Sequence, residues 1–182
     1  IDQSNTKYGN ARNNLRAIAM SDDISEDFVL MNDDFFIMKP IDRVHVWHGG
    51  SLQAKHKRRT QLQPYSAYTK YLRETYKTIK DSGVENPLDY ELHTPLPVKK
   101  SSIMDAVDKP GLWRSIISNK DSIGGELHED VKLYSEQSPL YRVRDDLDSS
   151  IYMSTDDRSF DSFLGNYLLK AFPDPSPYEL SV

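Results

Sequence analysis

Two adjacent acidic residues follow an apolar segment and offer the first sign of chemistry. Asn32, Asp33 and Asp34 come directly after the apolar run at residues 28–31, which we expect to be a buried strand. Neighbouring carboxylates at a strand end repel one another unless a cation or hydrogen-bond donors compensate them. Hard oxygen ligands suit Mg²⁺ or Mn²⁺, whose shells are completed by water and substrate phosphate. The cluster therefore indicates a metal site, with a helix cap or a solvated turn as the alternative.

One histidine has a position suited to proton transfer. His93 follows residues 90–92, which we expect to form a strand, and precedes Pro95 and Pro97, which are expected to forbid regular structure. An imidazole titrates close to neutral pH, so it can act as a general base or as a cation facing phosphate. A structural or surface role is the alternative for a single histidine.

Several further polar residues could bind phosphate or sugar hydroxyls through forked or paired hydrogen bonds. They are Arg12, Asn14, Arg114 and Asn119. The basic block at residues 55–59 could contact a phosphorylated or acidic glycan, and a solvated loop is its alternative.

Helical and strand patterns alternate along the chain. Apolar spacing predicts helices at residues 10–20, 65–80, 99–107 and 160–172, the last capped by Asp157 or Ser159. Short β-prone runs predict strands at residues 28–31, 35–38, 90–92, 130–134 and 150–153. This order favours a single α/β domain over residues 1–182, with its chemistry at the carboxyl ends of the strands.

Composition excludes several classes of function. The 182 residues include 23 Lys and Arg against 28 Asp and Glu, a net charge of −5 that gives no general reason to bind nucleic acid. The chain has no cysteine, so it has neither disulfides nor a thiol nucleophile, and it has no apolar run long enough for a transmembrane segment. We expect a cytoplasmic protein, and a homo-oligomer or larger assembly stays open.

Three motifs, taken together, resemble the Stealth family, the sugar-1-phosphate transferases of bacterial capsule synthesis and lysosomal-enzyme tagging. Residues 28–36 resemble the second conserved region of that family, and His93, Thr94 and Pro95 resemble the His-x-Pro of its third. Residues 154–157, the helix after them and residues 172–179 resemble its fourth. The first region has no counterpart here and residues 43–87 match poorly. Since the chain begins with Ile1, we expect an N-terminal segment to be missing and the domain to be incomplete.

The resemblance implies an A-type glycosyltransferase-like fold, with a mixed sheet flanked by helices. It also implies transfer of a hexose-1-phosphate from a UDP-sugar donor to a hydroxyl of a glycan acceptor, forming a phosphodiester. The implied catalytic residues are His93, Asp34 and Arg114; the implied ligands of Mg²⁺ or Mn²⁺ are Asp33, Asp34 and Asp157; and the implied substrate-binding residues are Arg12, Asn14, Asn32, Asn119 and Asp156. The alternatives are a glycosyltransferase of the same fold that releases UDP and a non-catalytic carbohydrate-binding or structural module.

Overall fold

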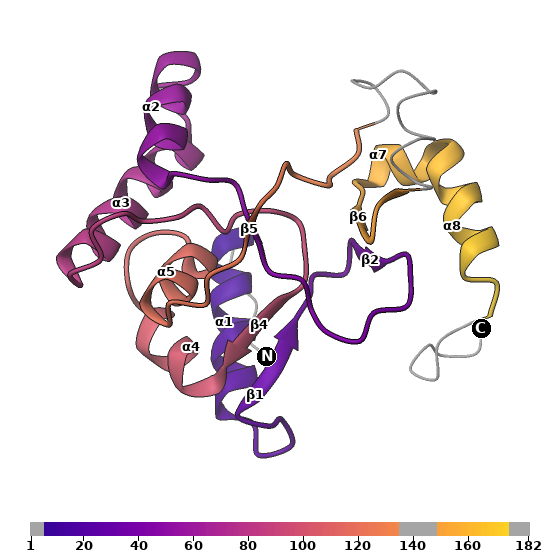
Figure 1. The fold of residues 1–182 in the computed structure, drawn as a ribbon, viewed down its shortest axis with the longest axis horizontal. Coiled ribbons are helices and arrows are strands. Elements are labelled where there is room, and N and C mark those ends of the chain that lie inside the picture. Colours follow the sequence, from indigo (N-terminus) through magenta and orange to yellow (C-terminus); the bar gives the residue numbers. More distant parts are fainter. Residues whose placement is uncertain (1–5, 135–148, 175–182) are drawn as a thin grey trace. The chain divides into compact units, whose positions relative to one another are not determined.

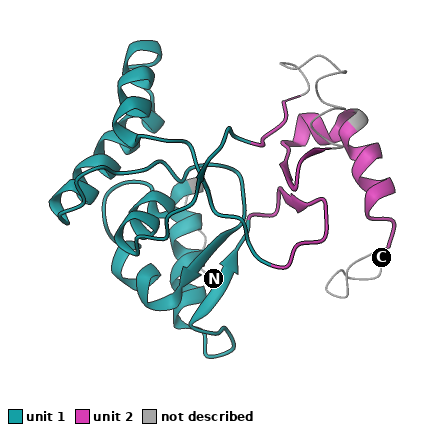
Figure 2. Cartoon of the chain, viewed as in Figure 1, with its two compact units in different colours: residues 1–31, 43–130 teal, residues 32–42, 131–182 magenta. Residues whose placement is uncertain are grey.

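The computed structural model shows a mixed α/β protein and describes residues 6–134 and 149–174 (Figure 1). The chain divides into two compact units, which Figure 2 shows in different colours. The first comprises residues 1–31 and 43–130, and the second comprises residues 32–42 and 131–182. One catalytic domain over residues 1–182 stays a prediction.

Five helices of the first unit are α1 (Lys7–Met20), α2 (Leu52–Leu62), α3 (Ala67–Asp81), α4 (Lys100–Ala106) and α5 (Trp113–Lys120). The predictions at residues 10–20, 65–80 and 99–107 are confirmed, whereas α5 was not predicted. Side chains cap the first three helices: Thr6, Ser51 and Ser66 each accept a hydrogen bond from the backbone N–H three residues later.

The basic block at residues 55–59 lies within helix α2, so the expectation of a solvated loop was wrong. The helix begins where Ser51 Oγ accepts from the N–H of Ala54 at 3.3 Å. Leu52 is its one buried residue. Because most of its other residues are polar, apolar spacing gave no helical signal, and the cap defines the helix instead.

Strands β1 (Asp27–Leu30) and β4 (Leu96–Lys99) form an antiparallel pair. Val29 and Met31 are exposed, so the expectation of a buried strand was wrong, because a two-stranded sheet covers only part of β1. Residues 90–92 are not a strand, and the strand instead runs through Pro97.

The position of Pro97 in β4 follows from the hydrogen-bonding register. Lys100 N–H donates to Glu26 O at 2.9 Å, and the pairs of an antiparallel ladder alternate. Val29 and Pro97 therefore face each other at a non-hydrogen-bonded position, where the proline nitrogen points away from β1. The prolines do not forbid regular structure here, because Pro97 occupies a position that needs no donor.

The remaining strands of the first unit are β3 (Trp47–His48) and β5 (Glu126–Leu127), which pair in parallel. Its core joins α1, α3, α4, α5 and β4 through Leu15, Leu72, Ile79, Leu96, Ile103 and Ile117. Tyr90 is also buried in this core, and its hydroxyl donates to Gly124 O at 2.8 Å. The segment that leads to His93 is thus held by packing rather than by a strand ladder.

The second unit contains the antiparallel pair β2 (Phe35–Ile37) and β6 (Tyr152–Ser154). Its core consists of Leu133, Met153, Leu164 and Leu168. The strand predicted at residues 130–134 is reduced to an isolated bridge between Lys132 and Ser154.

The predicted last helix is interrupted. It consists of α7 (Asp157–Ser159), a π-helical turn η1 (Phe160–Leu164) and α8 (Gly165–Ala171), with non-helical backbone at Ser162. A Cβ at Gly165 would lie 2.1 Å from Phe160 O, so the wide turn depends on glycine there. The cap is Asp156, whose Oδ1 accepts from Ser159 N–H at 2.9 Å, and not Asp157 or Ser159 as predicted. Residues 175–179 of the Stealth-like motif lie outside the described residues.

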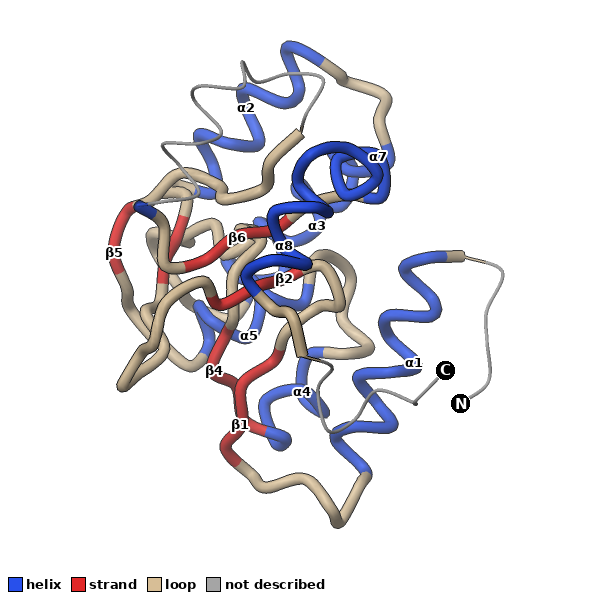
Figure 3. The backbone as a smooth tube through the Cα atoms, turned by 90° about the vertical axis from the view of Figure 1, so that its right-hand side faces the viewer, coloured by secondary structure: helices blue, strands red, loops and turns tan. Residues whose placement is uncertain are grey.

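Within the described ranges the strands form three separate two-stranded sheets, drawn in red in Figure 3, rather than the one mixed sheet that we expected. The mixed α/β class is confirmed. None of the described helices has the length and apolar character needed to cross a bilayer.

Candidate functional site

His93 and Asp130 form a hydrogen-bonded pair, called the dyad below, in the first unit. The His93 ring Nδ1 lies 2.8 Å from Oδ2 and 3.0 Å from Oδ1 of Asp130, and the His93 backbone N–H donates to Oδ1 at 3.0 Å. Burial opposes the charge on Asp130, but the hydrogen bonds and charge of His93 outweigh it and lower the pKa of the carboxyl. An ionised Asp130 favours the tautomer with the proton on Nδ1, in which the lone pair of the imidazole is on Nε2.

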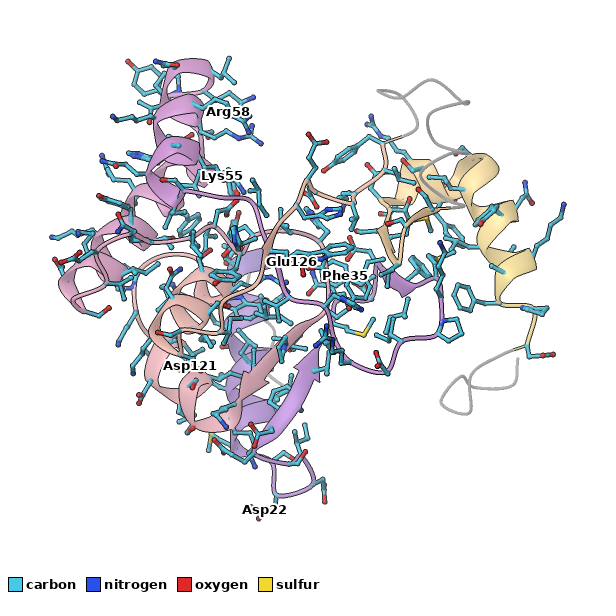
Figure 4. The ribbon with its side chains drawn as sticks, viewed as in Figure 1. Asp22, Phe35, Lys55, Arg58, Asp121 and Glu126 are labelled. Carbon is cyan, nitrogen blue, oxygen red and sulfur yellow. The ribbon has the colours of Figure 1, made fainter. Side chains whose placement is uncertain are left out.

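Asp130 also lines a cavity of about 800 Å³ that is bounded by helix α2 and residues 127–130. Three basic residues of α2, Lys55, Arg58 and Arg59, line the same cavity. Lys55 and Arg58 are labelled on α2 in Figure 4. The Arg59 guanidinium lies 5.4 Å from the centre of the Tyr68 ring, which supports its position. Asp130 thus joins the dyad to a cavity lined by three basic residues together with the acids Asp89 and Glu129, whereas His93 itself is not among the lining residues. Guanidinium groups in such a lining are suited to a phosphate-bearing substrate.

One cation of the cavity is balanced by a buried acid. Lys55 Nζ donates to Asp89 Oδ2 at 2.6 Å, and the Asp89 side chain is only 2% exposed. A Cβ at Gly49 would lie 2.5 Å from the same carboxylate oxygen. Since Lys55 is occupied by Asp89, the cations offered to an anionic ligand are chiefly Arg58 and Arg59.

Arg114 holds the loop that carries His93. It is 6% exposed, and it donates from Nε to Tyr90 O at 3.1 Å and from Nη2 to Thr94 O at 2.6 Å. Burial lowers the pKa of Arg114, an effect that the charges of Glu91, Asp130 and Asp89 oppose. Arg114 does not line the cavity, so its bonds on both sides of His93 make it a positioning residue.

Ser115 and Asn119 fix the same loop from helix α5. Glu91 Oε1 accepts from the N–H and hydroxyl of Ser115 at 2.9 and 2.8 Å, and burial raises the pKa of Glu91. Asn119 donates to Leu88 O and accepts from Leu88 N–H, both at 2.7 Å. Because the Asn119 amide also donates to Ser115 O at 2.7 Å, it is committed to the backbone rather than to a substrate.

The two expected substrate-binding residues on α1 lie apart from the dyad's loop. Arg12 Nη2 donates to Lys109 O at 3.2 Å, which joins α1 to the turn that follows α4. Asn14 is exposed on the same helix. Neither residue lines the cavity beside Asp130.

In the second unit, Asp34 is paired with Lys132. Lys132 Nζ donates to Asp34 Oδ2 at 2.8 Å, and Ser154 Oγ donates to the same oxygen at 3.3 Å. Burial opposes the charge on Lys132, but the hydrogen bond and charge of Asp34 outweigh it and raise the pKa of the lysine. Asp156 contributes more weakly to that shift, while its own pKa is lowered chiefly by hydrogen bonds from Ser159. Lys132 thus supplies the cationic partner that the sequence predicted to be a metal.

One carboxylate oxygen of the second unit is placed so that it could bind Mg²⁺ or Mn²⁺. Asp34 Oδ1 is buried and has no hydrogen-bond partner among the described residues, so it could serve as a ligand. Asn32, Asp33 and Asp157 are exposed. In the part of the chain covered by the structure, no group of three or more acids and histidines is arranged to hold a metal ion. A single carboxylate would suffice only for an ion whose other ligands are water and substrate phosphate.

Sequence reasoning missed Asp130, Lys132 and Asp89. Asp130 lies 37 residues from His93, and Lys132 lies 98 residues from Asp34. Residues so far apart in the sequence form no local pattern that would indicate their pairing. For Asp89 one clue was available, because an acid beside an apolar core segment needs a cation, and the nearby basic block could supply it.

No protein-family model matches this chain, and no curated protein is significantly similar to it. The assignment of function therefore depends on the geometry of the dyad and its cavity, together with the resemblance in the three motifs.

Proposed function

We propose that the protein transfers a hexose-1-phosphate from a UDP-sugar to a hydroxyl of a glycan, on a fold akin to the nucleotide-sugar glycosyltransferases. The observation that carries the proposal is the dyad, whose Asp130 lines a cavity together with Arg58 and Arg59. A general base beside cations is what phosphoryl transfer to a hydroxyl requires.

In this proposal His93 is the catalytic base. Its Nε2 takes the proton of the acceptor hydroxyl while that oxygen forms a bond to the sugar-bearing phosphorus. The bond from this phosphorus to the bridging oxygen of the pyrophosphate breaks, and the electron pair leaves with UMP. Asp130 stabilises the imidazolium that forms, as a carboxylate on Nδ1 does in other acid–base pairs.

The cationic residues of the cavity have a separate role. Arg58 and Arg59 stabilise negative charge on the transferred phosphoryl group and orient it, because forked guanidinium donors match phosphate oxygens. Arg114 acts indirectly by fixing the carbonyls on either side of His93. It replaces the direct contact with phosphate that the resemblance implied.

Mg²⁺ or Mn²⁺ belongs to the proposal on the basis of the resemblance and of the unpartnered Asp34 Oδ1. When bound, the ion would act as a Lewis acid toward phosphate oxygens. Asp34 is the residue best suited to hold it, with Asp33 and Asp157 as the further ligands that the resemblance implies.

A non-catalytic carbohydrate-binding module is the second candidate. The specific observation in its favour is the ion pair of Asp34 with Lys132, since a lysine on Oδ2 competes with a metal for this carboxylate. Such a module would bind sugars in the cavity of the first unit without releasing any nucleotide.

One experiment separates these functions. The protein is incubated with a panel of UDP-sugars, Mg²⁺ or Mn²⁺ and candidate glycans, and UMP is separated from UDP by chromatography. We expect UMP, and we expect it to disappear in His93→Ala but not in His45→Ala, a histidine outside the dyad. UDP as product would indicate a glycosyltransferase. Sugar binding without either nucleotide would indicate the binding module.

A further inference from the structure

The first unit carries a local positive charge that opposes the charge of the rest of the chain. Helices α2 and α3 and their connection, residues 52–81, contain eight Lys and Arg residues and two acids. This pair of helices, called the basic hairpin, therefore has a formal charge of +6, whereas the whole chain has −5 and the remainder −11. In Figure 1, α2 leads away from strands β1 and β4 of the same unit. The positive charge is thus concentrated in one pair of helices.

The turn at the end of the basic hairpin exposes apolar side chains. Leu62, the last residue of α2, is 69% exposed, and Tyr65 in the turn is 99% exposed. Binding of a soluble polyanion would not require an exposed leucine at this position. A tyrosine and a leucine flanked by basic residues are, however, typical of segments that lie in the interface of a bilayer.

A cavity opens beside this turn. Its volume is about 390 Å³, and its lining includes His56, Thr60, Tyr65, Thr69, Lys70 and Arg73. No acid is among the described residues that line it. Lys70 has a long exposed contact with Glu74 at 3.8 Å, which holds it only weakly. Within the described ranges, no hydrogen bond or ion pair engages the side chains of His56 and Arg73, so both can turn to an anionic group.

We propose that the tip of the basic hairpin docks on an anionic phospholipid surface, with Leu62 and Tyr65 inserted at the headgroup level and a lipid phosphate held by Lys70 and Arg73. The three observations are independent: segregated charge, an exposed apolar turn and a cationic cavity next to it. This docking is peripheral, and it does not depend on the function proposed for the dyad. It also concerns a segment, residues 43–87, that the Stealth resemblance matches poorly.

The test is co-sedimentation of the protein with vesicles of phosphatidylcholine mixed with phosphatidylserine, compared with phosphatidylcholine alone. We expect binding to the mixed vesicles only. Each cation near an anionic surface adds about fivefold in affinity, so Lys70→Gln/Arg73→Gln should bind about 25-fold more weakly. Lys77→Gln/Lys80→Gln, which removes the same charge from α3 outside the cavity, should lose much less.

The apolar turn has its own variant and control. Leu62→Ser should weaken vesicle binding about tenfold, because it removes an inserted side chain. Met20→Ser, at an equally exposed position of α1, should not change it. Circular dichroism checks that each variant is folded.

Several results would overturn the docking proposal. They are no binding to mixed vesicles, equal binding to phosphatidylcholine alone, and an equal loss in both double-charge variants. Binding to soluble polyglutamate that competes with vesicles and is unaffected by Leu62→Ser would assign the basic hairpin to a soluble polyanion instead. Nucleotide release is measured without vesicles, so failure of the transferase proposal and failure of docking are scored separately.

Discussion

Asp130 in the first unit and Asp34 in the second are two partly exposed carboxylates, each paired with one basic side chain at 2.8 Å. Their partners differ in what they can do. A histidine exchanges its proton near neutral pH, whereas the raised pKa of Lys132 keeps that lysine protonated. The comparison teaches that the partner of an acid, rather than the acid, decides between proton transfer and a fixed ion pair.

The largest expected effect is on the dyad. Asp130→Asn should lower the rate of UMP release about 10²- to 10⁴-fold, because an amide neither fixes the tautomer of His93 nor stabilises its imidazolium. Asp81→Asn makes the same change at the end of α3, outside the dyad, and should leave the rate unchanged. A change of less than a few fold in Asp130→Asn would show that the dyad does not carry the proton.

The next effect is on the pair in the second unit. Lys132→Met should lower the free energy of unfolding by about 1–3 kcal/mol, since a carboxylate whose side chain is 28% exposed loses its cation but keeps partial contact with water. Urea unfolding measures this change, and Asp34→Asn/Lys132→Met should regain most of the loss. If the double variant is as unstable as the single one, the loss comes from packing of the lysine stem and not from the unpaired charge.

The same Lys132→Met variant sharpens the metal proposal. Removing the competing lysine should let Mg²⁺ or Mn²⁺ bind Asp34 more tightly, so added metal should raise the urea midpoint of the variant more than that of the parent. Metal-free buffer with a chelator provides the reference. An identical response of both proteins would remove Asp34 from the proposed ligands.

A smaller effect follows from the opposite directions of the pKa shifts. The lowered pKa of Asp130 means that its contribution to stability is present above its ordinary pKa, about 4, and is lost as the pH falls through the folded value. The raised pKa of Lys132 means that its contribution is present below about 10.4 and is lost as the pH rises through the folded value. The free energy of unfolding, measured with urea across pH, should therefore fall less steeply at acid pH in Asp130→Asn than in the parent. It should fall less steeply at alkaline pH in Lys132→Met.

The smallest effect is expected at an exposed ion pair. Lys99 Nζ lies 2.5 Å from Asp27 Oδ1, but their side chains are 52% and 75% exposed. Water and salt screen such a pair, so Lys99→Ala should leave the urea midpoint unchanged within error. A clear loss would mean that distance alone, and not exposure, ranks the ion pairs of this protein.

Local signals in the sequence predicted much of the secondary structure. The apolar spacing of α3 and the β-prone runs at β1, β2 and β6 correspond to elements of the structure. Helix α2 was missed because its apolar signal reduces to Leu52, and the strand through Pro97 was missed because the register that tolerates proline depends on β1, more than sixty residues earlier.

The candidate site was less accessible from sequence. The sequence singled out His93 and Asp34, but their partners lie far along the chain, and only the fold brings them within 3 Å. Arg114 and Asn119 were recognised as residues able to bind phosphate or sugar, yet both form hydrogen bonds with backbone groups of residues 88–94 instead. Residue type indicates what a side chain can bind, whereas burial decides which partner it reaches.

Pro97 also has a consequence for how copies of this protein meet. Its nitrogen points away from β1 and carries no hydrogen, so the outer side of β4 lacks a donor at its centre. A strand from another copy that approached this side would find an incomplete ladder. The proline thus makes extension of the sheet into an aggregate unfavourable at this edge, and replacing it would restore a template for that growth.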